Sequence, residues 1–124
     1  MSRGQIGKRL DGLDILLLTT RGRKSGKLYE TPMPYFTHPD GFLLIASNAG
    51  SSVNPAWYHN LLNEPEVNIQ LGSKHYPVIA RSLTGQERTS WWRELITRQP
   101  RYAGYQGTTT REIPIVLLIT KEPQ

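Results

Sequence analysis

The chain has 124 residues, with 15 lysines and arginines against 10 acidic residues and a formal net charge of +5. This length suits one domain, and the excess of cations favours an anionic partner: a phosphorylated small molecule, a nucleic acid or a membrane surface. The lack of cysteine excludes disulfides, thiolate metal ligands and a cysteine nucleophile. No apolar run approaches the roughly 20 residues of a membrane span, and the first ten residues lack the apolar core of a secretory signal. We therefore expect a cytoplasmic protein.

The first part of the chain predicts three strands. Residues 13–20 form a short apolar run flanked by glycines, which is typical of a buried strand. Residues 21–27 contain two glycines and four cations and predict a loop. Residues 28–37 are rich in β-formers but hold two prolines, which predict an irregular strand or an edge. After a turn, residues 42–46 predict the returning strand.

The middle of the chain predicts a helix and a hairpin. Asn54 before Pro55 is typical of a helix start, with an N-cap oxygen followed by proline at the first helical position. The helix should extend to about residue 63. Residues 67–71 alternate like a half-buried strand and lead through a Gly-Ser turn into a strand over 74–83, where a proline again suggests an edge.

The last part predicts a second helix and a last strand. Thr84 and Glu87 have the spacing of a capping box, so we expect a helix to begin there and to end before Pro100. Residues 101–110 contain two glycines, two tyrosines and three threonines and predict a loop. Residues 113–120 predict the last strand.

These elements favour a mainly β (α+β) fold. About six strands follow one another with few crossovers, so the sheet should be antiparallel, with two or three peripheral helices. Curling into a barrel removes the sheet edges that a domain of this size would otherwise expose. We expect residues 13–124 to form the single domain, preceded by a short leader over residues 1–12.

The most informative segment is the loop Gly22-Arg23-Lys24-Ser25-Gly26. Glycines let a ligand approach the backbone closely, while the cations and the hydroxyl suit a phosphate group. A solvated basic hairpin turn explains the same residues equally well.

Two further segments are candidates for ligand contact. The small residues 46–52 end at a predicted helix N-terminus and could contact a ring or a phosphate, although an ordinary loop is an equal alternative. Tyr102 and Tyr105 could cover a flat ligand and donate hydrogen bonds, or pack at the mouth of the barrel. Three tryptophans at helical spacing predict core rather than site: Trp57, Trp91 and Trp92.

The chain lacks the residue patterns that several other kinds of site require. His38, His59 and His75 are scattered and have no metal-ligand spacing, so we expect no metal. The chain has neither the G-x-S-x-G of a serine hydrolase nor the G-x-G-x-x-G of a dinucleotide fold. A protein without acid–base machinery of its own can take its reactivity from a cofactor.

Residues 16–26, residues 46–50 leading into 54–61, and residues 102–106 followed by 111–116 together resemble the deazaflavin (F420)-dependent nitroreductase family. The resemblance implies a split β-barrel related to flavin-mononucleotide-binding oxidoreductases. It also implies a hydride transfer from reduced coenzyme F420 to an electron-poor quinone, enone or nitro compound.

The resemblance further implies a set of site residues. At the phosphate and acidic tail of the cofactor it places Arg23, Lys24 and Ser25. Along the cofactor, or in the helix that flanks it, it places Pro32, Ile45, Ala46, Ser47, Asn48, Asn54, Pro55 and Asn60. In the substrate cavity it places Tyr102 and Tyr105, which with Ser47 near the reactive ring are the catalytic candidates. Many relatives have a basic residue where this chain has Tyr29, and some have a longer N-terminal segment over the site.

Several alternatives stay open at this stage. The same fold could use FMN, or the protein could bind a deazaflavin without catalysis. Specific nucleic-acid binding is disfavoured because aromatic residues are not interleaved with the cations of the basic loop. Membrane contact would be at most peripheral, on the inner face, through Arg3, Lys8 and Arg9. The small-molecule enzyme that we expect is a monomer or a homodimer.

Overall fold

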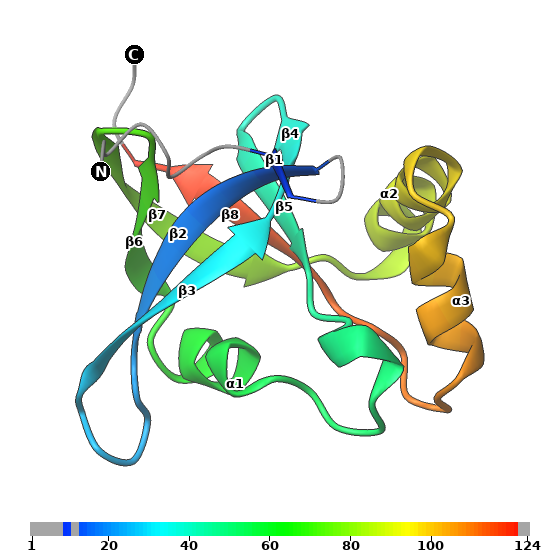
Figure 1. The fold of residues 1–124 in the computed structure, drawn as a ribbon, viewed down its shortest axis with the longest axis horizontal. Helices are drawn as coiled ribbons and strands as arrows, with labels where there is room; N and C mark the ends of the chain where they lie inside the picture. The colour runs from blue at the N-terminus through cyan, green and yellow to red at the C-terminus, as the bar shows by residue number, and fades with distance from the viewer. Residues whose placement is uncertain (1–8, 11–12, 122–124) are drawn as a thin grey trace.

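The computed structural model describes residues 9–10 and 13–121. Most of the expected leader, including Arg3 and Lys8, lies outside the described residues. The strands are β1 Arg9–Leu10, β2 Leu13–Arg21, β3 Leu28–Pro34, β4 Phe36–His38, β5 Gly41–Ile45, β6 Glu66–Leu71, β7 Lys74–Ser82 and β8 Ile115–Thr120. The helices are the 3₁₀-helix η2 Asn48–Gly50, and α1 Ala56–Asn63, α2 Gly85–Arg98 and α3 Arg101–Gly107 (Figure 1).

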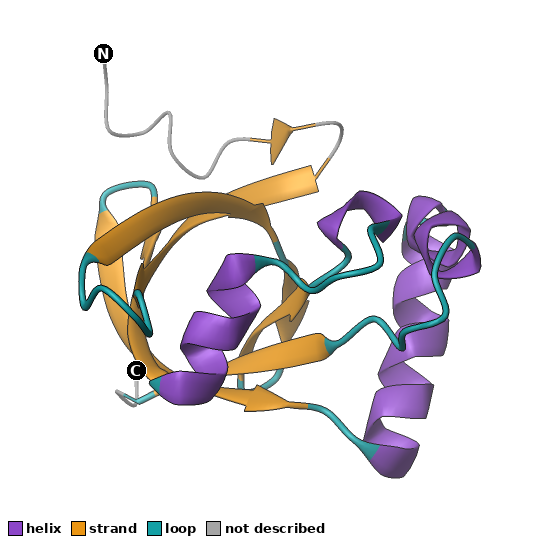
Figure 2. Cartoon of the chain, turned by 90° about the horizontal axis from the view of Figure 1, so that it is seen from below, coloured by secondary structure: helices purple, strands orange, loops and turns teal. Residues whose placement is uncertain are grey.

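The eight strands form one sheet in the order β1-β2-β6-β7-β8-β5-β4, with β3 paired to β2. Every pairing is antiparallel. Figure 2 shows the sheet curling into a barrel, with α1 across one open end and α2 and α3 beside it. The predicted antiparallel barrel is therefore confirmed. The count exceeds six because Tyr35 divides one predicted strand into β3 and β4, and because β1 adds a short pairing to β2.

β8 separates two hydrophobic clusters. Ile115 and Leu117 face the cluster under α2 and α3, whereas Val116 and Leu118 face the barrel interior, where Leu61 of α1 also packs. Successive side chains of a strand point to opposite faces. This explains why β8 is an unbroken apolar run rather than an alternating one, and why α1 closes the barrel while α2 and α3 cover its side.

The prediction of a loop over residues 101–110 is wrong, because Arg101–Gly107 is helix α3. Two glycines lower its intrinsic helix propensity. The ring of Tyr102 is nevertheless buried, with its centroid 6.2 Å from that of Phe36. Burial of an aromatic ring of this kind stabilises a helix that its local sequence does not favour.

The prediction that Pro77 marks an edge is also wrong, because β7 lies between β6 and β8. The carbonyl of Pro77 accepts a hydrogen bond from the N–H of Lys121, one residue beyond the end of β8. The last pair of β7 and β8 is Val78 with Thr120, so Pro77 lies just beyond their ladder and interrupts none of its pairs.

Both helices begin near the predicted residues but without the predicted caps. Pro55, not Asn54, occupies the N-cap position of α1. Thr84 stands at the N-cap of α2 but makes no capping hydrogen bond with its side chain. Glu87 pairs instead with Arg81, at 2.9 Å, so the capping box does not form. Within the described part of the chain, no helix combines the length and apolarity needed to cross a membrane.

Candidate active site

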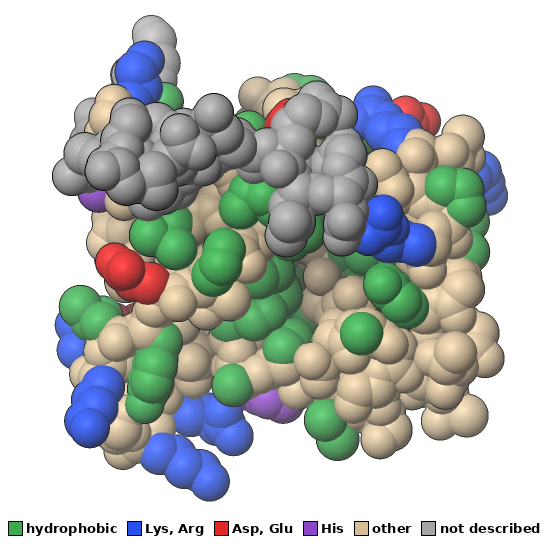
Figure 3. Space-filling model, in the orientation of Figure 1, with side chains coloured by type: hydrophobic (Ala, Val, Ile, Leu, Met, Phe, Trp, Pro, Cys, Tyr) green, Lys and Arg blue, Asp and Glu red, His purple; other side chains and the backbone are tan. Residues whose placement is uncertain are grey.

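The basic turn between β2 and β3 is a structured, exposed hairpin end. The N–H of Gly22 donates to the Lys27 carbonyl at 2.7 Å, and the N–H of Gly26, with φ +75°, donates to the Gly22 carbonyl at 2.9 Å. A side chain at Gly22 would come within 2.7 Å of the Tyr29 ring and 2.8 Å of Ser25 Oγ. Glycine therefore lets the Tyr29 ring and the Ser25 hydroxyl lie directly against the backbone here. Lys and Arg side chains gather over this hairpin end, at the lower left of Figure 3.

Asn60 attaches the turn to helix α1. Its Oδ1 accepts a hydrogen bond from the N–H of Arg23 at 3.2 Å, and its Nδ2 donates to Thr20 Oγ1 at 3.3 Å. Asn60 and Thr20 are 6% and 1% exposed. Since a buried amide is costly to leave unpaired, these bonds fix the position of the turn relative to α1.

A cavity of about 480 Å³ lies between the turn and the first turn of α1. This size falls in the range of about 300–1,000 Å³ that is usual for small-molecule sites. The lining residues combine cations, hydroxyls, an amide and aromatic rings: Thr20, Gly22, Arg23, Lys24, Ser25, Tyr29, Thr31, Ala56, Trp57 and Asn60. Such a wall can hold an anionic group beside a flat apolar one.

The cations of the cavity differ from their neighbour in the same hairpin. Arg21 forms an ion pair with Glu64 at 3.5 Å. Among the residues that the structure describes, neither the Arg23 guanidinium nor the Lys24 ammonium has an acidic partner. Their charge is available to a ligand.

The cavity brings together part of the predicted cofactor set. Arg23, Lys24, Ser25 and Asn60 line it. The lining does not include the other predicted cofactor residues, which are Pro32, Ile45, Ala46, Ser47, Asn48, Asn54 and Pro55. Ile45 and Ala46 are 6% and 0% exposed, and the N–H of Ala46 donates to the Pro114 carbonyl at 2.9 Å, so Ala46 presents no surface to a ligand in this structure.

The loop from Ala46 to Asn54 has an unusual backbone. Asn48 and Ala49 have φ values of +48° and +54°, a region that non-glycine residues seldom adopt. Ser47 is half-buried, and its carbonyl accepts a hydrogen bond from the N–H of Gly50 at 2.9 Å. Oδ1 of Asn54 accepts from Arg111 at 2.7 Å, so this side chain is already engaged within the protein.

The two candidate tyrosines differ in accessibility. Tyr102 is 6% exposed, and burial raises the pKa of its phenol above the ordinary value. Tyr105 is half-buried, with its ring centroid 5.9 Å from that of Tyr102. Thr108, which follows α3, donates to the Gly50 carbonyl at 2.9 Å and joins α3 to η2. Neither tyrosine is among the residues that line the cavity.

Six lining residues were not in the predicted cofactor set: Gly22, which belongs to the predicted basic loop, and Thr20, Tyr29, Thr31, Ala56 and Trp57. Trp57, predicted as core, both packs against the barrel interior and lines the cavity. Thr20 pairs with Tyr29 across β2 and β3. Alternate residues of a strand lie on the same face, so Tyr29 and Thr31 could have been predicted to lie together beside the basic turn.

The family described as F420H(2)-dependent quinone reductase matches residues 1–120. The chain belongs to this family. It is thus an F420-dependent oxidoreductase, and the resemblance to deazaflavin-dependent enzymes is confirmed.

Individual relatives agree with the family. The F420H(2)-dependent quinone reductase Rv1261c of Mycobacterium tuberculosis (strain ATCC 25618 / H37Rv) is 35% identical over 121 residues, covering 94% of this chain and 81% of the relative. The solved F420-H2 dependent reductase FDR-A is 38% identical with a TM-score of 0.74, covering 84% of this chain and 92% of that one. A solved structure described as a domain-swapped dimer is 38% identical with a TM-score of 0.75, covering 84% and 78%. The fold of this F420H(2)-dependent quinone reductase family member is the split β-barrel of FMN-binding-like proteins.

The cavity residues fit the anionic end of F420. Gly22 brings the Tyr29 ring and the Ser25 hydroxyl against the backbone of the turn, and Arg23 and Lys24 have no acidic partner among the described residues. Charge-assisted hydrogen bonds from such groups are roughly twice as strong as neutral ones. Trp57 and Tyr29 add aromatic surface to the same wall.

Proposed function

We propose that this protein transfers a hydride from reduced F420 to a quinone and holds the anionic tail of the cofactor between the β2–β3 turn and α1. The observation that carries the proposal is the pair of cations, Arg23 and Lys24, at a cavity of about 480 Å³ in a member of this family. When bound, the reduced cofactor supplies the hydride, and the redox chemistry belongs to it.

The residues of the cavity bind and orient the tail. Arg23 and Lys24 provide charge, and Asn60 fixes the turn that carries them. Ser25 Oγ accepts from the N–H of Lys27 at 3.1 Å and lies 3.2 Å from the Tyr29 hydroxyl. This pair can rearrange to donate to a phosphate oxygen. Tyr29, where many relatives have a basic residue, therefore contributes a hydroxyl and a ring rather than a third charge.

The acceptor side is proposed for the surface near Ser47 and Tyr105. Thr108 joins α3 to Gly50 of η2, and Ser47 immediately precedes η2. The two hydroxyl-bearing residues thus come from adjoining elements. Either one, or solvent, can deliver a proton to the reduced acceptor. Because Tyr102 is buried, we assign it to supporting Tyr105, its ring neighbour. Enones and nitro compounds are further acceptors in this proposal.

The remaining predicted cofactor residues stay in the proposal through their position next to the cavity wall or in the loop after β5. Pro32 follows Thr31 of the cavity wall, and Pro55 precedes Ala56. Ile45, Ala46 and Asn48 lie at the end of β5 or in the loop after it. This loop would hold the deazaflavin ring between the tail cavity and Ser47.

The oligomeric state and the cellular location of the protein are also proposals. A relative described as a domain-swapped dimer supports a homodimer over a monomer. Light scattering on the purified protein tests this, and a monomer at all concentrations would exclude it. A cytoplasmic location, with at most peripheral membrane contact, stays a prediction.

The function is tested by mixing the protein anaerobically with reduced F420 and a soluble quinone such as menadione, and by following the oxidised cofactor. We expect reoxidation in proportion to protein concentration. Reoxidation no faster than the protein-free rate, with menadione, an enone and a nitroarene, would remove the enzyme function. A parallel titration with FMN tests the alternative cofactor. We expect FMN to bind more weakly than F420 because it lacks the acidic tail.

A further inference from the structure

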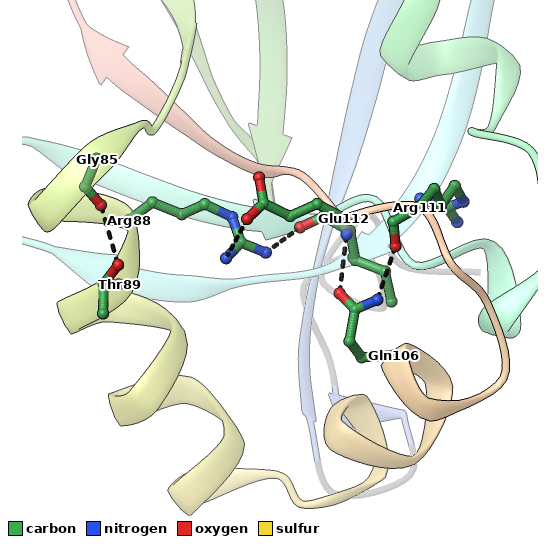
Figure 4. Close-up of polar contacts among 7 residues, drawn as sticks. Gly85, Arg88, Thr89, Gln106, Arg111 and Glu112 are labelled. Carbon is green, nitrogen blue, oxygen red and sulfur yellow. Dashed lines mark hydrogen bonds and ion pairs between the residues drawn. The ribbon is translucent and has the colours of Figure 1, made fainter.

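Arg111 lies between α3 and β8 in the chain, and its guanidinium donates hydrogen bonds to the loop from Ala46 to Asn54. Nε donates to the Ser51 carbonyl at 2.9 Å, and Nη2 donates to the Ser47 carbonyl at 2.7 Å. Nη1 donates to the Ala46 carbonyl at 3.3 Å and to Asn54 Oδ1 at 2.7 Å. One side chain therefore contacts four residues of this loop, all through uncharged oxygens. Figure 4 shows the Arg111 side chain pointing away from Gln106.

Other contacts of the loop are local or reach one residue at a time: Asn48 Nδ2 donates to the Val53 carbonyl at 3.0 Å, and Thr108 donates to the Gly50 carbonyl at 2.9 Å. The loop's own backbone bonds in η2 run from Gly50 to Ser47, at 2.9 Å, and from Ser51 to Asn48, at 3.0 Å. Asn48 and Ala49 are in the left-handed region, which costs free energy for residues with a side chain. A strained segment persists only where its surroundings determine its conformation, and Arg111 contributes by holding residues on both sides of Asn48 and Ala49, namely Ser47 and Ser51.

The conformation of this loop bears on the site at both ends. At one end the chain enters α1 after Pro55, and Ala56 and Trp57 form part of the cavity wall. At the other end Ala46 leaves β5 next to Ser47. An arginine contacting both Ala46 and Asn54 thus sets the separation between the end of β5 and the start of α1.

Arg111 is itself held on the α3 side. Gln106 Nε2 donates to the Arg111 carbonyl at 2.7 Å, and Gln106 Oε1 accepts from the N–H of Ile113 at 2.9 Å (Figure 4). Gln106 directly follows Tyr105. The loop on the cofactor side and the helix on the acceptor side are therefore anchored through one residue.

We propose that Arg111 is a positioning residue for F420 binding: it holds the Ala46–Asn54 loop in the conformation that the cofactor requires. The inference rests on the proposed function, because the loop matters to catalysis only if the cofactor passes along it. The planar guanidinium suits the task, since its donors diverge in a fixed fork. A lysine has three donors on a single nitrogen and cannot reach all four acceptors.

The test compares Arg111→Lys and Arg111→Met with Arg88→Met in the full chain. Arg88 is a matched control, because it also joins a helix to the segment before β8: it donates to the Ile113 carbonyl and forms an ion pair with Glu112 at 3.4 Å (Figure 4). Its guanidinium also lies 5.0 Å from the centroid of the Trp92 ring. None of its contacts involves the Ala46–Asn54 loop. Three properties are measured: amide hydrogen exchange of the loop without cofactor, the Kd for F420, and the Tm.

We expect Arg111→Met to speed the exchange of the Gly50 and Ser51 amides and to raise the Kd for F420 at least tenfold at a temperature where the variant is folded. Arg111→Lys should give an intermediate Kd. Arg88→Met should lower the Tm and leave both the loop exchange and the Kd at wild-type values. If Arg111→Met does not fold, the Kd and loop exchange of Arg111→Lys decide the question in the same way.

A folded Arg111 variant with a lower Tm but wild-type exchange and Kd would overturn the proposal and leave Arg111 a purely structural residue. An equal rise in Kd for Arg88→Met would overturn it as well, because the effect would then follow general destabilisation. If the wild-type protein bound no F420, the proposed function would fail. Unaltered loop exchange in the variants would instead show that Arg111 does not hold the Ala46–Asn54 loop.

Discussion

Asn60 Oδ1 accepts a hydrogen bond from the backbone N–H of Arg23 at 3.2 Å, and this bond connects positions 37 residues apart. It joins the exposed basic hairpin end between β2 and β3 to the helix that closes the barrel. The turn is for this reason one wall of a cavity whose other wall is the start of α1, and its cations are held where an anion could bind between the two.

Replacing Asn60 with alanine should separate these walls. The N–H of Arg23 and the hydroxyl of Thr20 would lose their partner, so we expect a loss of about 1–3 kcal/mol in the free energy of unfolding. The Kd for F420 should rise as well. Urea unfolding and fluorescence titration measure the two effects. Asn63→Ala, at an exposed residue of the same helix, is the control and should change neither; equal effects in both variants would contradict the role of Asn60.

Lys24→Ala should weaken F420 binding roughly tenfold, or by about 1.4 kcal/mol, because an exposed charge-assisted contact is lost. The affinity of the wild type should fall with added salt, and that of the variant should fall less steeply. Lys27→Ala removes a charge from the same turn at a residue outside the cavity lining. An equal loss of affinity in both variants would mean that the turn acts only through its total charge.

Gly50→Ala and Gly104→Ala should have opposite effects on stability. Gly50 has φ +81°, and a Cβ there would lie 2.2 Å from Thr108 Oγ1. We expect a loss of about 2–4 kcal/mol from strain and overlap. A Cβ at Gly104, in α3, would meet nothing within 4 Å. Alanine there should add about 0.5–1 kcal/mol, as in other helix interiors. Denaturant unfolding of both variants checks the pair, and a stable Gly50→Ala would show that η2 does not pack on α3 as described.

The buried phenol of Tyr102 should make the protein less stable at alkaline pH. Burial, partly opposed by Arg101 and reinforced by Tyr105, raises the pKa of its phenol above that of an unfolded tyrosine. The folded chain therefore keeps this proton at a pH where the unfolded chain has lost it. The stabilisation is complete below about pH 10, the ordinary value, and is lost as pH rises through the folded pKa. Tyr102→Phe should make the decline in unfolding free energy above pH 10 shallower; an unchanged slope would exclude this origin.

The sequence predicted the features whose chemistry is local. A glycine-flanked run of cations predicts the turn between β2 and β3, and the alternation of β6 predicts a half-buried strand. The antiparallel barrel follows from the short connections between strands. Asn60 was predicted only through the family resemblance, since a single asparagine in a helix carries no signal that it bonds to a turn.

Features that depend on distant contacts were missed or wrongly predicted. Helix α3 depends on the burial of Tyr102, which outweighs two glycines. Pro77 is tolerated because β8 ends beside it. The contacts of Arg111 join residues 57 to 65 positions apart, and nothing near Arg111 in the sequence indicates them. Trp57 has the spacing of a core residue and is partly one, which concealed its second role.

The most direct measurement is a titration of ¹⁵N-labelled protein with F420, followed through the backbone amides of residues 22–25 and the indole N–H of Trp57. If the cavity holds the anionic tail, these signals should shift and saturate together, and Lys24→Ala should move the midpoint to higher cofactor concentration. Saturable F420 binding that leaves all of these signals in place would show that the tail binds elsewhere and would contradict the proposed site.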